Sequence, residues 1–364
     1  MIPIAKPLIG ETETQYVMEV LKSGILAQGP KVKELEERFA QLCKTKHAVA
    51  VNSGTAAIHA ALYAAGVRRG DEVITTPFTF VATANPIIMQ GAKPVFVDIK
   101  EDTFNIDPES VIEKITPKTK AIIPVDLFGQ IYDYKAISEI AEDKKIKVVE
   151  DACQAVNAQI DGKMAGSLGD LACFSFYATK NIISGEGGII TTDNRDYAEL
   201  ARRFRHHGQS EQTRYEYFDL GYNYRMMDLQ AAIALAQLEK VDAFTDRRIE
   251  NARLLTKGLK DIKGIGVPYI KPGTKHVFHQ YTIKVDGFRL NRNKLIEHLN
   301  KNDIGCGIYY PKPLHLHPFF MKAGYKKGDL PVSESASEKV LSLPVHPSVS
   351  KDDIKKIVEV IKYA

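Results

Sequence analysis

The sequence predicts an α/β protein with a mostly parallel sheet between two layers of helices, followed by a smaller α+β region. Three observations carry this prediction. Between about residues 31 and 195, short apolar runs alternate with stretches of helical periodicity. The runs are apolar almost throughout, which is typical of strands buried on both faces of a parallel sheet. After about residue 244 this alternation stops, which indicates a second domain.

The first region contains the elements of the sheet and of its helical layers. The predicted strands are HAVAVN (47–52), EVITTP (72–77), KPVFVDI (93–99), KAIIPVD (120–126), IKVVED (146–151), LACFSF (171–176) and GGIITT (187–192). The predicted helices between them cover 32–44, 56–66, 108–115 and 134–143. The first helix is indicated by an apolar stripe at Val32, Leu35 and Phe39, and the second by its end at Gly66.

The second region follows a helix predicted over 227–244. Its predicted elements are a helix over 249–262, a strand over 279–285, a helix over 291–300, a strand at GIYY (307–310) and a final helix over 351–363. We therefore expect a large domain over 1–244 and a small α+β domain over 245–364. The N-terminal segment is free to pack on the small domain.

Composition limits the possible functions. The 364 residues are 44% hydrophobic, and 49 Lys and Arg face 45 Asp and Glu, so the net charge of +4 is small and spread along the chain. This excludes a disordered chain and does not favour a nucleic-acid partner. An apolar leader and a membrane-length apolar run are both absent from the sequence. Four cysteines without a CxxC pair indicate reduced thiols, so we expect a cytoplasmic protein.

Two strand ends carry residues that suit an anion or a ring nitrogen. In Asn52-Ser53-Gly54-Thr55, a strand leads into a helix whose first N–H groups would hold a phosphate, although a plain Ser cap explains the pattern equally well. Asp151 directly follows a β-branched run, where a carboxylate binds a protonated ring nitrogen or a metal, or caps the next helix. The zinc motif HEXXH and the phosphate motifs GxxxxGK[ST] and GxGxxG are absent.

A single lysine after a buried strand adds a reactive group. Lys180 stands in SFYATKNIISGEGG, with hydroxyl residues before it and a glycine turn after it. A Schiff-base lysine needs a partly desolvated amine and a backbone that lets a coenzyme approach closely. The alternative is a solvated surface lysine, which the apolar and glycine-rich surroundings disfavour.

Together these strings resemble one family over essentially the whole chain. NSGTAA, TFVATANPI, VDLFGQ, VVEDACQA, SFYATKNIISGEGG, GYNYRMMDLQAAIALAQL, PKPLH and LSLPVHP resemble, in order, the DegT/DnrJ/EryC1/StrS family. These are pyridoxal phosphate (PLP)-dependent sugar aminotransferases of fold type I. The resemblance implies the aspartate-aminotransferase-like fold, with a seven-stranded sheet.

The resemblance also implies site residues. Lys180 would form the Schiff base with PLP, and Asp151 would pair with the pyridinium nitrogen and keep it protonated. The remaining coenzyme contacts would come from Ser53, Gly54, Thr55 and Ser175 at the phosphate, Phe80 and Gln154 at the ring, and Asn223 from the second subunit. A homodimer with shared active sites is therefore expected.

The implied reaction has two halves. An amino donor such as L-glutamate converts PLP to pyridoxamine phosphate (PMP), and a nucleotide-linked keto-sugar then accepts the amine. Family members that act as dehydratases replace the lysine with histidine, whereas this chain keeps Lys180. Two alternatives stay open. One is an aminotransferase for a cyclitol or another ring without a nucleotide, and the other is a PLP-binding regulatory protein without catalysis.

Further residues lie in or beside the family motifs. Tyr177, Arg225, Tyr310 and His315 are candidates for contacts with sugar hydroxyls or the diphosphate, or else pack in the core or at the dimer interface. No metal site is expected, because no acidic residue stands at ligand spacing from the histidines.

Overall fold

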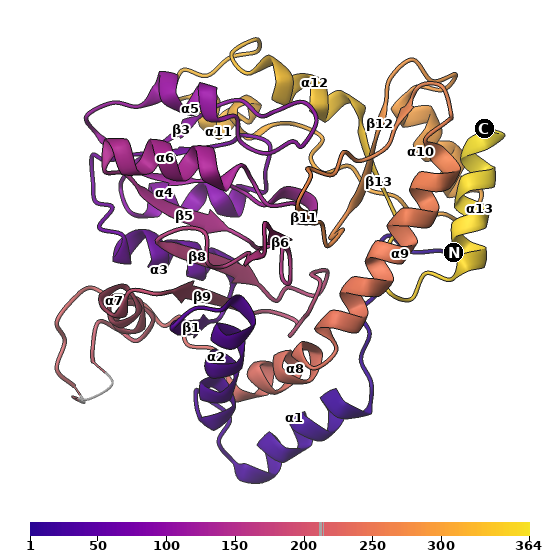
Figure 1. Ribbon diagram of the computed structural model, residues 1–364. Coiled ribbons are helices and arrows are strands. Elements are labelled where there is room, and N and C mark those ends of the chain that lie inside the picture. The colour runs from indigo at the N-terminus through magenta and orange to yellow at the C-terminus, as the bar shows by residue number, and fades with distance from the viewer. Residues whose placement is uncertain (211–212, 214) are drawn as a thin grey trace.

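The computed structural model describes residues 1–210, 213 and 215–364, and Figure 1 shows its arrangement. A seven-stranded sheet forms its centre, in the order β1-β9-β8-β5-β4-β2-β3. The strands are β1 (His47–Val51), β2 (Glu72–Thr75), β3 (Lys93–Phe96), β4 (Thr119–Ile123), β5 (Lys147–Asp151), β8 (Leu171–Ser175) and β9 (Gly188–Thr192). Each overlaps one of the seven predicted runs, and only β4 begins one residue before its run, so the predicted fold class is confirmed.

The sheet is parallel except at one strand. β3, β2, β4, β5 and β8 pair in parallel, and β9 runs antiparallel to both of its neighbours, β8 and β1. In the register of β5 and β8, Asp151 stands opposite Cys173. Because parallel strands end at the same edge of a sheet, Asp151 and Ser175 come to the same edge.

Helices cover both faces of this sheet (Figure 1). Strand residues alternate between the two layers: Val49 and Val149 pack with one helical layer, whereas Ala48 and Val148 pack with the other. The helices of the first layer are α3 (Gly54–Ala64) and α7 (Arg195–Arg205), and those of the second are α2 (Pro30–Cys43), α6 (Tyr134–Lys144) and α8 (Asp228–Leu238). Burial on both sides explains why the strand sequences are mainly apolar.

Helix α1 (Glu11–Ser23) packs against α8. The shorter elements of this part are η1 (Val81–Thr83), α4 (Asn85–Met89), α5 (Pro108–Lys114), η2 (Leu127–Gly129), and the strands β6 (Gln159–Ile160) and β7 (Lys163–Met164). Strand β11 (Thr274–Lys275) pairs with β6, so a segment near residue 275 is tied to the large sheet region.

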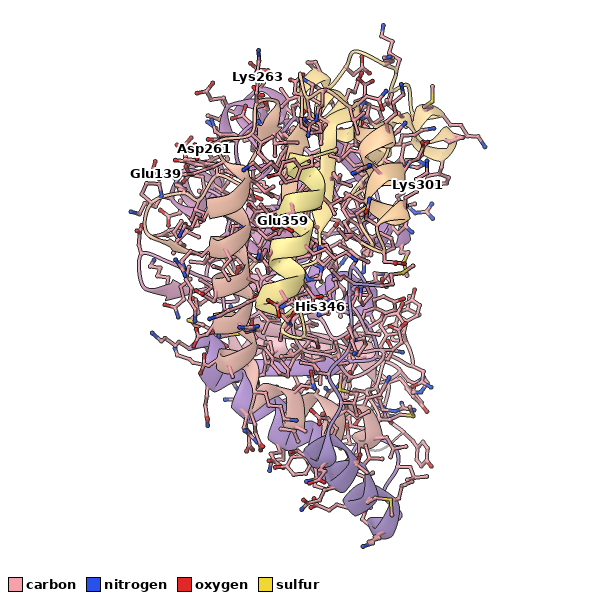
Figure 2. All side chains as sticks on the ribbon, turned by 90° about the vertical axis from the view of Figure 1, so that its right-hand side faces the viewer. Glu139, Asp261, Lys263, Lys301, His346 and Glu359 are labelled. Atoms are coloured by element: carbon pink, nitrogen blue, oxygen red, sulfur yellow. The ribbon has the colours of Figure 1, made fainter. Side chains whose placement is uncertain are left out.

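The C-terminal part has its own sheet and core. Strands β10 (Ile265–Gly266), β12 (Tyr281–Val285) and β13 (Val340–Leu343) form it. It packs against α9 (Val241–Leu259), α10 (Arg292–Lys301) and α13 (Lys351–Lys362). Helices α9 and α13 contact each other and lie side by side in Figures 1 and 2. The remaining elements are η3 (Leu314–Leu316), α11 (Pro318–Met321) and α12 (Pro331–Lys339).

Three predicted elements differ from the structure. The helix expected over 227–244 is two helices, because the chain turns at Glu239 and Lys240 between α8 and α9, and the helix expected over 249–262 is the continuation of α9. The strand expected at 307–310 is absent from the described residues. Only Gly307 bonds to Ser342 there, and Tyr309 and Tyr310 turn away to pack against the cluster around Phe78. The third strand of the small sheet is β13 instead.

The N-terminal residues contact the C-terminal part. The N–H of Ile2 donates to Asp303 O at 2.7 Å, and the N–H of Gly305 donates to Ile2 O at 2.8 Å. Residue 244 lies inside the continuous helix α9, so the proposed domain boundary falls within a helix rather than in a linker. In the described residues, no helix is both long enough and apolar enough to span a membrane.

Candidate active site

A buried carboxylate marks the carboxyl edge of the sheet. Asp151, the last residue of β5, is 4% exposed. Its Oδ2 accepts a hydrogen bond from the Thr83 hydroxyl at 2.7 Å, and its Oδ1 accepts one from the N–H of Cys153 at 3.2 Å. The Thr83 hydroxyl in turn lies 2.9 Å from that of Thr79, four positions earlier. Since both carboxylate oxygens are held, the orientation of Asp151 is fixed.

A glutamine and two aromatic rings lie beside this carboxylate. The Oε1 of Gln154 accepts a hydrogen bond from the N–H of Phe128 at 2.8 Å, and its amide Nε2 donates to the hydroxyl of Tyr310 at 3.3 Å. Burial, and after it the nearby Asp151, raises the pKa of Tyr310. The ring of Phe80 is 58% exposed and lies 6.3 Å from that of Tyr310. Phe80 therefore offers an open aromatic face to a ligand at this edge.

The start of α3 forms a cradle next to Asp151. Ser53 caps the helix, because its hydroxyl accepts a hydrogen bond from the N–H of Ala56 at 3.1 Å. Gly54 and Thr55 begin the helix, and the first N–H groups of a helix have no acceptor within it. A Cβ at Gly54 would come within 2.9 Å of the Cβ of Ser175 and 3.2 Å of the Sγ of Cys153. The absence of a side chain at Gly54 therefore keeps this cradle open.

Lys180 lies in the loop that follows β8. It is half-buried, and its N–H donates to Tyr177 O at 2.8 Å. Burial raises the pKa of the Cys153 thiol well above its usual value; the nearby Asp151 raises it further, while Lys180 lowers it. One thiol thus lies close to both charged groups. Lys180 and Asp151, which are 29 positions apart in sequence, come to the same edge of the sheet.

Some predicted residues lie apart from this group. His315 is 0% exposed, and its Nε2 is 3.0 Å from the Oε1 of Glu334, so the structure does not bring it to Asp151. Arg225 pairs with β1 at Val51, and its guanidinium lies 2.7 Å from the Nδ1 of His206. Asn223 is exposed, and its carbonyl accepts a hydrogen bond from Asn52 Nδ2 at 3.3 Å. Its expected role in a second subunit stays a prediction.

The structure adds residues that sequence reasoning missed. Thr79 and Thr83 support Asp151, and their hydroxyls at a spacing of four in TFVATAN were a readable signal. The Oδ1 of Asn181, next to Lys180, lies 3.0 Å from the Nδ1 of His279. The two residues are 98 positions apart, so no local sequence pattern predicts this contact. No group of three or more His, Cys, Asp or Glu within the described part of the chain is placed to hold a metal ion.

The sheet, the helix-terminal cradle, and a lysine and an aspartate at or after the carboxyl ends of strands are those of a PLP-dependent aminotransferase of fold type I. Within that class, the chain belongs to the DegT/DnrJ/EryC1/StrS aminotransferase family, which it matches over residues 7–362. It is 39% identical to the GDP-perosamine synthase of Caulobacter vibrioides over 360 residues, 98% of this chain and 96% of that protein. It is also 44% identical to a Geobacillus stearothermophilus protein named pleiotropic regulatory protein over 346 residues, 94% and 91% of the two chains.

Solved structures agree with this assignment. DesV of S. venezuelae, solved with a ketimine intermediate, matches with a TM-score of 0.93 at 35% identity, over 96% of this chain and 93% of that one. The Streptococcus pneumoniae protein Spr1654, solved in its PLP and PMP forms, matches with a TM-score of 0.94 at 31% identity. The protein is therefore a sugar aminotransferase by family, and PLP is its coenzyme.

The residues present fit this coenzyme. The cradle at Gly54, which a Cβ would fill, suits a phosphate at a helix start. The fixed carboxylate of Asp151 suits a protonated ring nitrogen, and the exposed ring of Phe80 suits an aromatic partner.

Proposed function

We propose that this protein transfers an amino group from L-glutamate to a nucleotide-linked keto-sugar, giving an amino sugar for polysaccharide, glycan or secondary-metabolite biosynthesis. The observation that carries the proposal is the placement of the buried Asp151 at the carboxyl edge of the sheet, beside the open cradle of α3, with Lys180 in the loop that follows β8. The relative named GDP-perosamine synthase supports a nucleotide-linked sugar as the acceptor.

Each residue has a defined task in this proposal. Bound PLP supplies an aldehyde that takes up amino groups and a ring that withdraws electrons. Lys180 would hold the coenzyme through its amine and, when that amine is free, would carry a proton to and from the substrate. Asp151 would keep the ring nitrogen protonated, while Gly54, Thr55 and Ser175 would bind the phosphate. Gln154 and Tyr310 would help to orient the ring.

The acceptor's diphosphate needs positive charge near the site. Arg225 is the candidate of the family motifs, because a planar guanidinium pairs with two phosphate oxygens at once. In the described chain it lies against His206, half-buried. Tyr177, 47% exposed on the Lys180 loop, would contact the sugar.

A homodimer with shared sites completes the proposal. Four exposed apolar side chains are candidates for burial by a second copy: Phe80, Tyr177, Leu220 and Met227. Asn223 would then reach the coenzyme phosphate of the partner. Mixing Asn223→Ala with Lys180→Ala should restore part of the activity that each variant lacks, because one site of the mixed dimer is intact. Failure to restore any activity in a mixed dimer isolated by two affinity tags would contradict shared sites.

The experiment that tests the function is Lys180→Ala. With PLP added, the wild-type protein should show a visible absorption band and should keep the coenzyme covalently after borohydride reduction. The variant should lose both, and amine transfer from L-glutamate should fall below detection. Lys263→Ala, which changes an exposed lysine of the small domain, is the matched control. If the Lys180→Ala variant is still trapped by borohydride, the assignment of Lys180 is wrong.

A regulatory role is the second candidate, because one relative carries the name pleiotropic regulatory protein. Lys180, Asp151 and Gln154 are all present, which favours catalysis. Conversion of bound PLP to PMP by L-glutamate in a single turnover separates the two functions. Turnover with UDP-, GDP- or dTDP-linked keto-sugars then separates nucleotide sugars from cyclitols and other free rings.

A further inference from the structure

The loop that carries Lys180 is the hairpin loop between β8 and β9, residues 176–187. Its two sides are tied together, because the N–H of Ala178 donates to Gly185 O at 3.1 Å. Among the described residues, one side chain of this loop, that of Asn181, carries its hydrogen bonds to the chain outside β8, the loop and β9. The loop is therefore held from outside through the residue next to the lysine.

Both hydrogen bonds of Asn181 go to one segment, residues 276–280. Its Nδ2 donates to Val277 O at 3.4 Å, and its Oδ1 lies 3.0 Å from the Nδ1 of His279. Because an amide oxygen can only accept, the Nδ1 of His279 has to carry the proton and donate it. Asn181 and His279 are each 7% exposed, so water competes little for this hydrogen bond.

The segment that holds Asn181 is itself fixed on two sides. Arg248, from α9, donates through Nη1 to the carbonyls of Phe278 at 3.2 Å and His279 at 3.3 Å. The N–H of Val277 donates to Gly129 O at 3.0 Å. A side chain bound to this segment is therefore bound to both α9 and the large sheet region.

The same segment supports the glutamine beside Asp151. The N–H of Gln280 donates to Phe128 O at 3.3 Å, and the N–H of Phe128 donates to the Oε1 of Gln154 at 2.8 Å. Residues 276–280 thus set the positions of Gln154 and of the Lys180 loop relative to one another.

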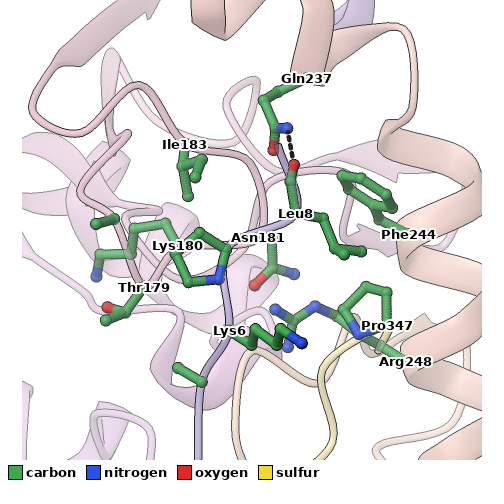
Figure 3. A pocket seen from close by; sticks show the side chains of 13 residues that line it. Lys6, Leu8, Thr179, Lys180, Asn181, Ile183, Gln237, Phe244, Arg248 and Pro347 are labelled. Carbon is green, nitrogen blue, oxygen red and sulfur yellow. Dashed lines mark hydrogen bonds between the residues drawn. The ribbon is translucent and has the colours of Figure 1, made fainter. Parts of the chain in front are cut away.

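Lys180 and Asn181 leave the loop on different sides. Figure 3 shows the Lys180 side chain extending away from that of Asn181, which lies on the side of the Arg248 guanidinium. Asn181 and Arg248 line the same small cavity. The loop can therefore be held through Asn181 while the lysine amine stays available to a ligand.

His279 is a neutral donor between two cations. Burial, and after it the charges of Lys180 and Arg248, lower the pKa of His279 well below its usual value. The ring is therefore neutral at neutral pH, and it binds Asn181 without adding a third positive charge near the lysine.

We propose that His279 is a positioning residue for Lys180, which it holds in place through the hydrogen bond to Asn181. This inference rests on the proposed function, because Lys180 is the coenzyme lysine of that function. It adds a side chain from the C-terminal part of the chain that acts through Lys180 rather than by touching the coenzyme.

Hydrogen exchange in the apoprotein tests the tether without coenzyme. His279→Phe keeps a ring and loses the donor, so the amides of residues 178–183 should exchange about tenfold faster, as expected for one lost hydrogen bond. His279→Asn should restore exchange to within about threefold of the wild type, because its amide can donate from the position of Nδ1.

His276→Phe is the matched control. His276 is also buried in this segment, but its Nδ1 accepts a hydrogen bond from the N–H of Phe278 at 3.0 Å and does not hold the Lys180 loop. The variant loses one buried hydrogen bond, as His279→Phe does, and it should leave the exchange of residues 178–183 unchanged.

A double-mutant cycle shows whether His279 acts through the lysine. His279→Phe should raise the dissociation constant of PLP about tenfold when Lys180 is present. In Lys180→Ala, the same change should raise it less than about twofold, because the group that His279 positions is gone. A side chain that only stabilises the fold would weaken PLP binding equally in both backgrounds.

Asn181→Ala removes the other partner of the hydrogen bond and should reproduce both results, which keeps the test valid if His279→Phe does not fold. Unchanged exchange in both variants, or an equal loss of PLP affinity with and without the lysine side chain, would overturn the proposal. If Lys180→Ala binds PLP as tightly as the wild type, the proposed function fails, whereas faster exchange in His279→Phe still supports the tether.

Discussion

Two adjacent carboxylates on β5 lie in opposite surroundings: one faces the proposed site and the other is enclosed in the protein. Side chains alternate along a strand, so Glu150 and Asp151 point to opposite faces of the sheet. Asp151 lies at the start of α3, where Thr83 and Cys153 hold it next to the open cradle. Glu150 faces the other layer, where the N–H groups of Gly166 and Leu168 donate to it at 3.0 and 3.3 Å.

Glu150 also has an acidic neighbour. Burial, and next the negative charge of Glu150, raises the pKa of Asp126 well above its usual range, and burial raises the pKa of Glu150 to about 7. The pair thus keeps at least one proton at neutral pH and is closed to ligands. A carboxylate alone therefore does not mark a site; the hydrogen-bond donors around it and its access to an opening do.

The largest effect is expected for Asp151→Asn. The amide would keep most contacts of the carboxylate, but it cannot stabilise positive charge on the ring nitrogen of the coenzyme. We expect turnover with L-glutamate to fall at least about a thousandfold, as when a charge-stabilising group is removed from an active site. The unfolding midpoint of the apoprotein should change by only a few degrees. Activity within tenfold of the wild type, measured at saturating PLP, would contradict the proposed pairing.

The fold was largely predictable because its strands are buried on both faces. Each strand of the large sheet has a mainly apolar run at its centre, which needs no tertiary information to recognise. Helix α1 was not predicted, because its burial comes from distant partners: Glu13 bonds to Gln237 and Lys240, more than 220 positions away. The strand expected at 307–310 failed for the same reason, since the aromatic cluster around Phe78 decides where Tyr310 packs.

The site was predictable to the extent that its chemistry follows strand ends. Asp151 and Lys180 stand directly after buried strands, so their residue types could be interpreted as chemistry. The partner of a side chain could not be read in this way. His315 stands in a family motif, yet it bonds to Glu334, and Thr83 reaches Asp151 from 68 positions away.

A smaller loss of turnover is expected for Thr83→Val, which tests the hydrogen bond that orients Asp151. Valine keeps the shape of threonine and removes the hydroxyl that donates to Oδ2 at 2.7 Å. Loss of one hydrogen bond to a charged group corresponds to about a tenfold loss of turnover. The absorption spectrum of bound PLP should also change its pH dependence, because Asp151 is held less firmly. Thr79→Val removes only the hydroxyl that contacts Thr83, so it should lower turnover less than Thr83→Val does. An equal loss of turnover in both variants would contradict a direct role of Thr83 at Asp151.

The smallest effect on turnover is expected for Glu150→Gln, whose consequences lie in stability. The pKa of Glu150 is about 7 in the folded protein, above its ordinary value of 4.5, so the folded state binds more protons than the unfolded state between these pH values. The free energy of unfolding of the wild type should therefore decrease as the pH rises from 4.5 to 7. In Glu150→Gln this decrease should be shallower by about 1.4 kcal/mol per pH unit, because one titrating group is gone. Urea unfolding at pH 5, 6 and 7 measures the slope.

Turnover at pH 7.5 should stay within about threefold, since the hydrogen bonds of Asp151 on the opposite face are intact. Identical slopes, or a loss of turnover as large as that of Asp151→Asn, would show that the two carboxylates are not separate in function.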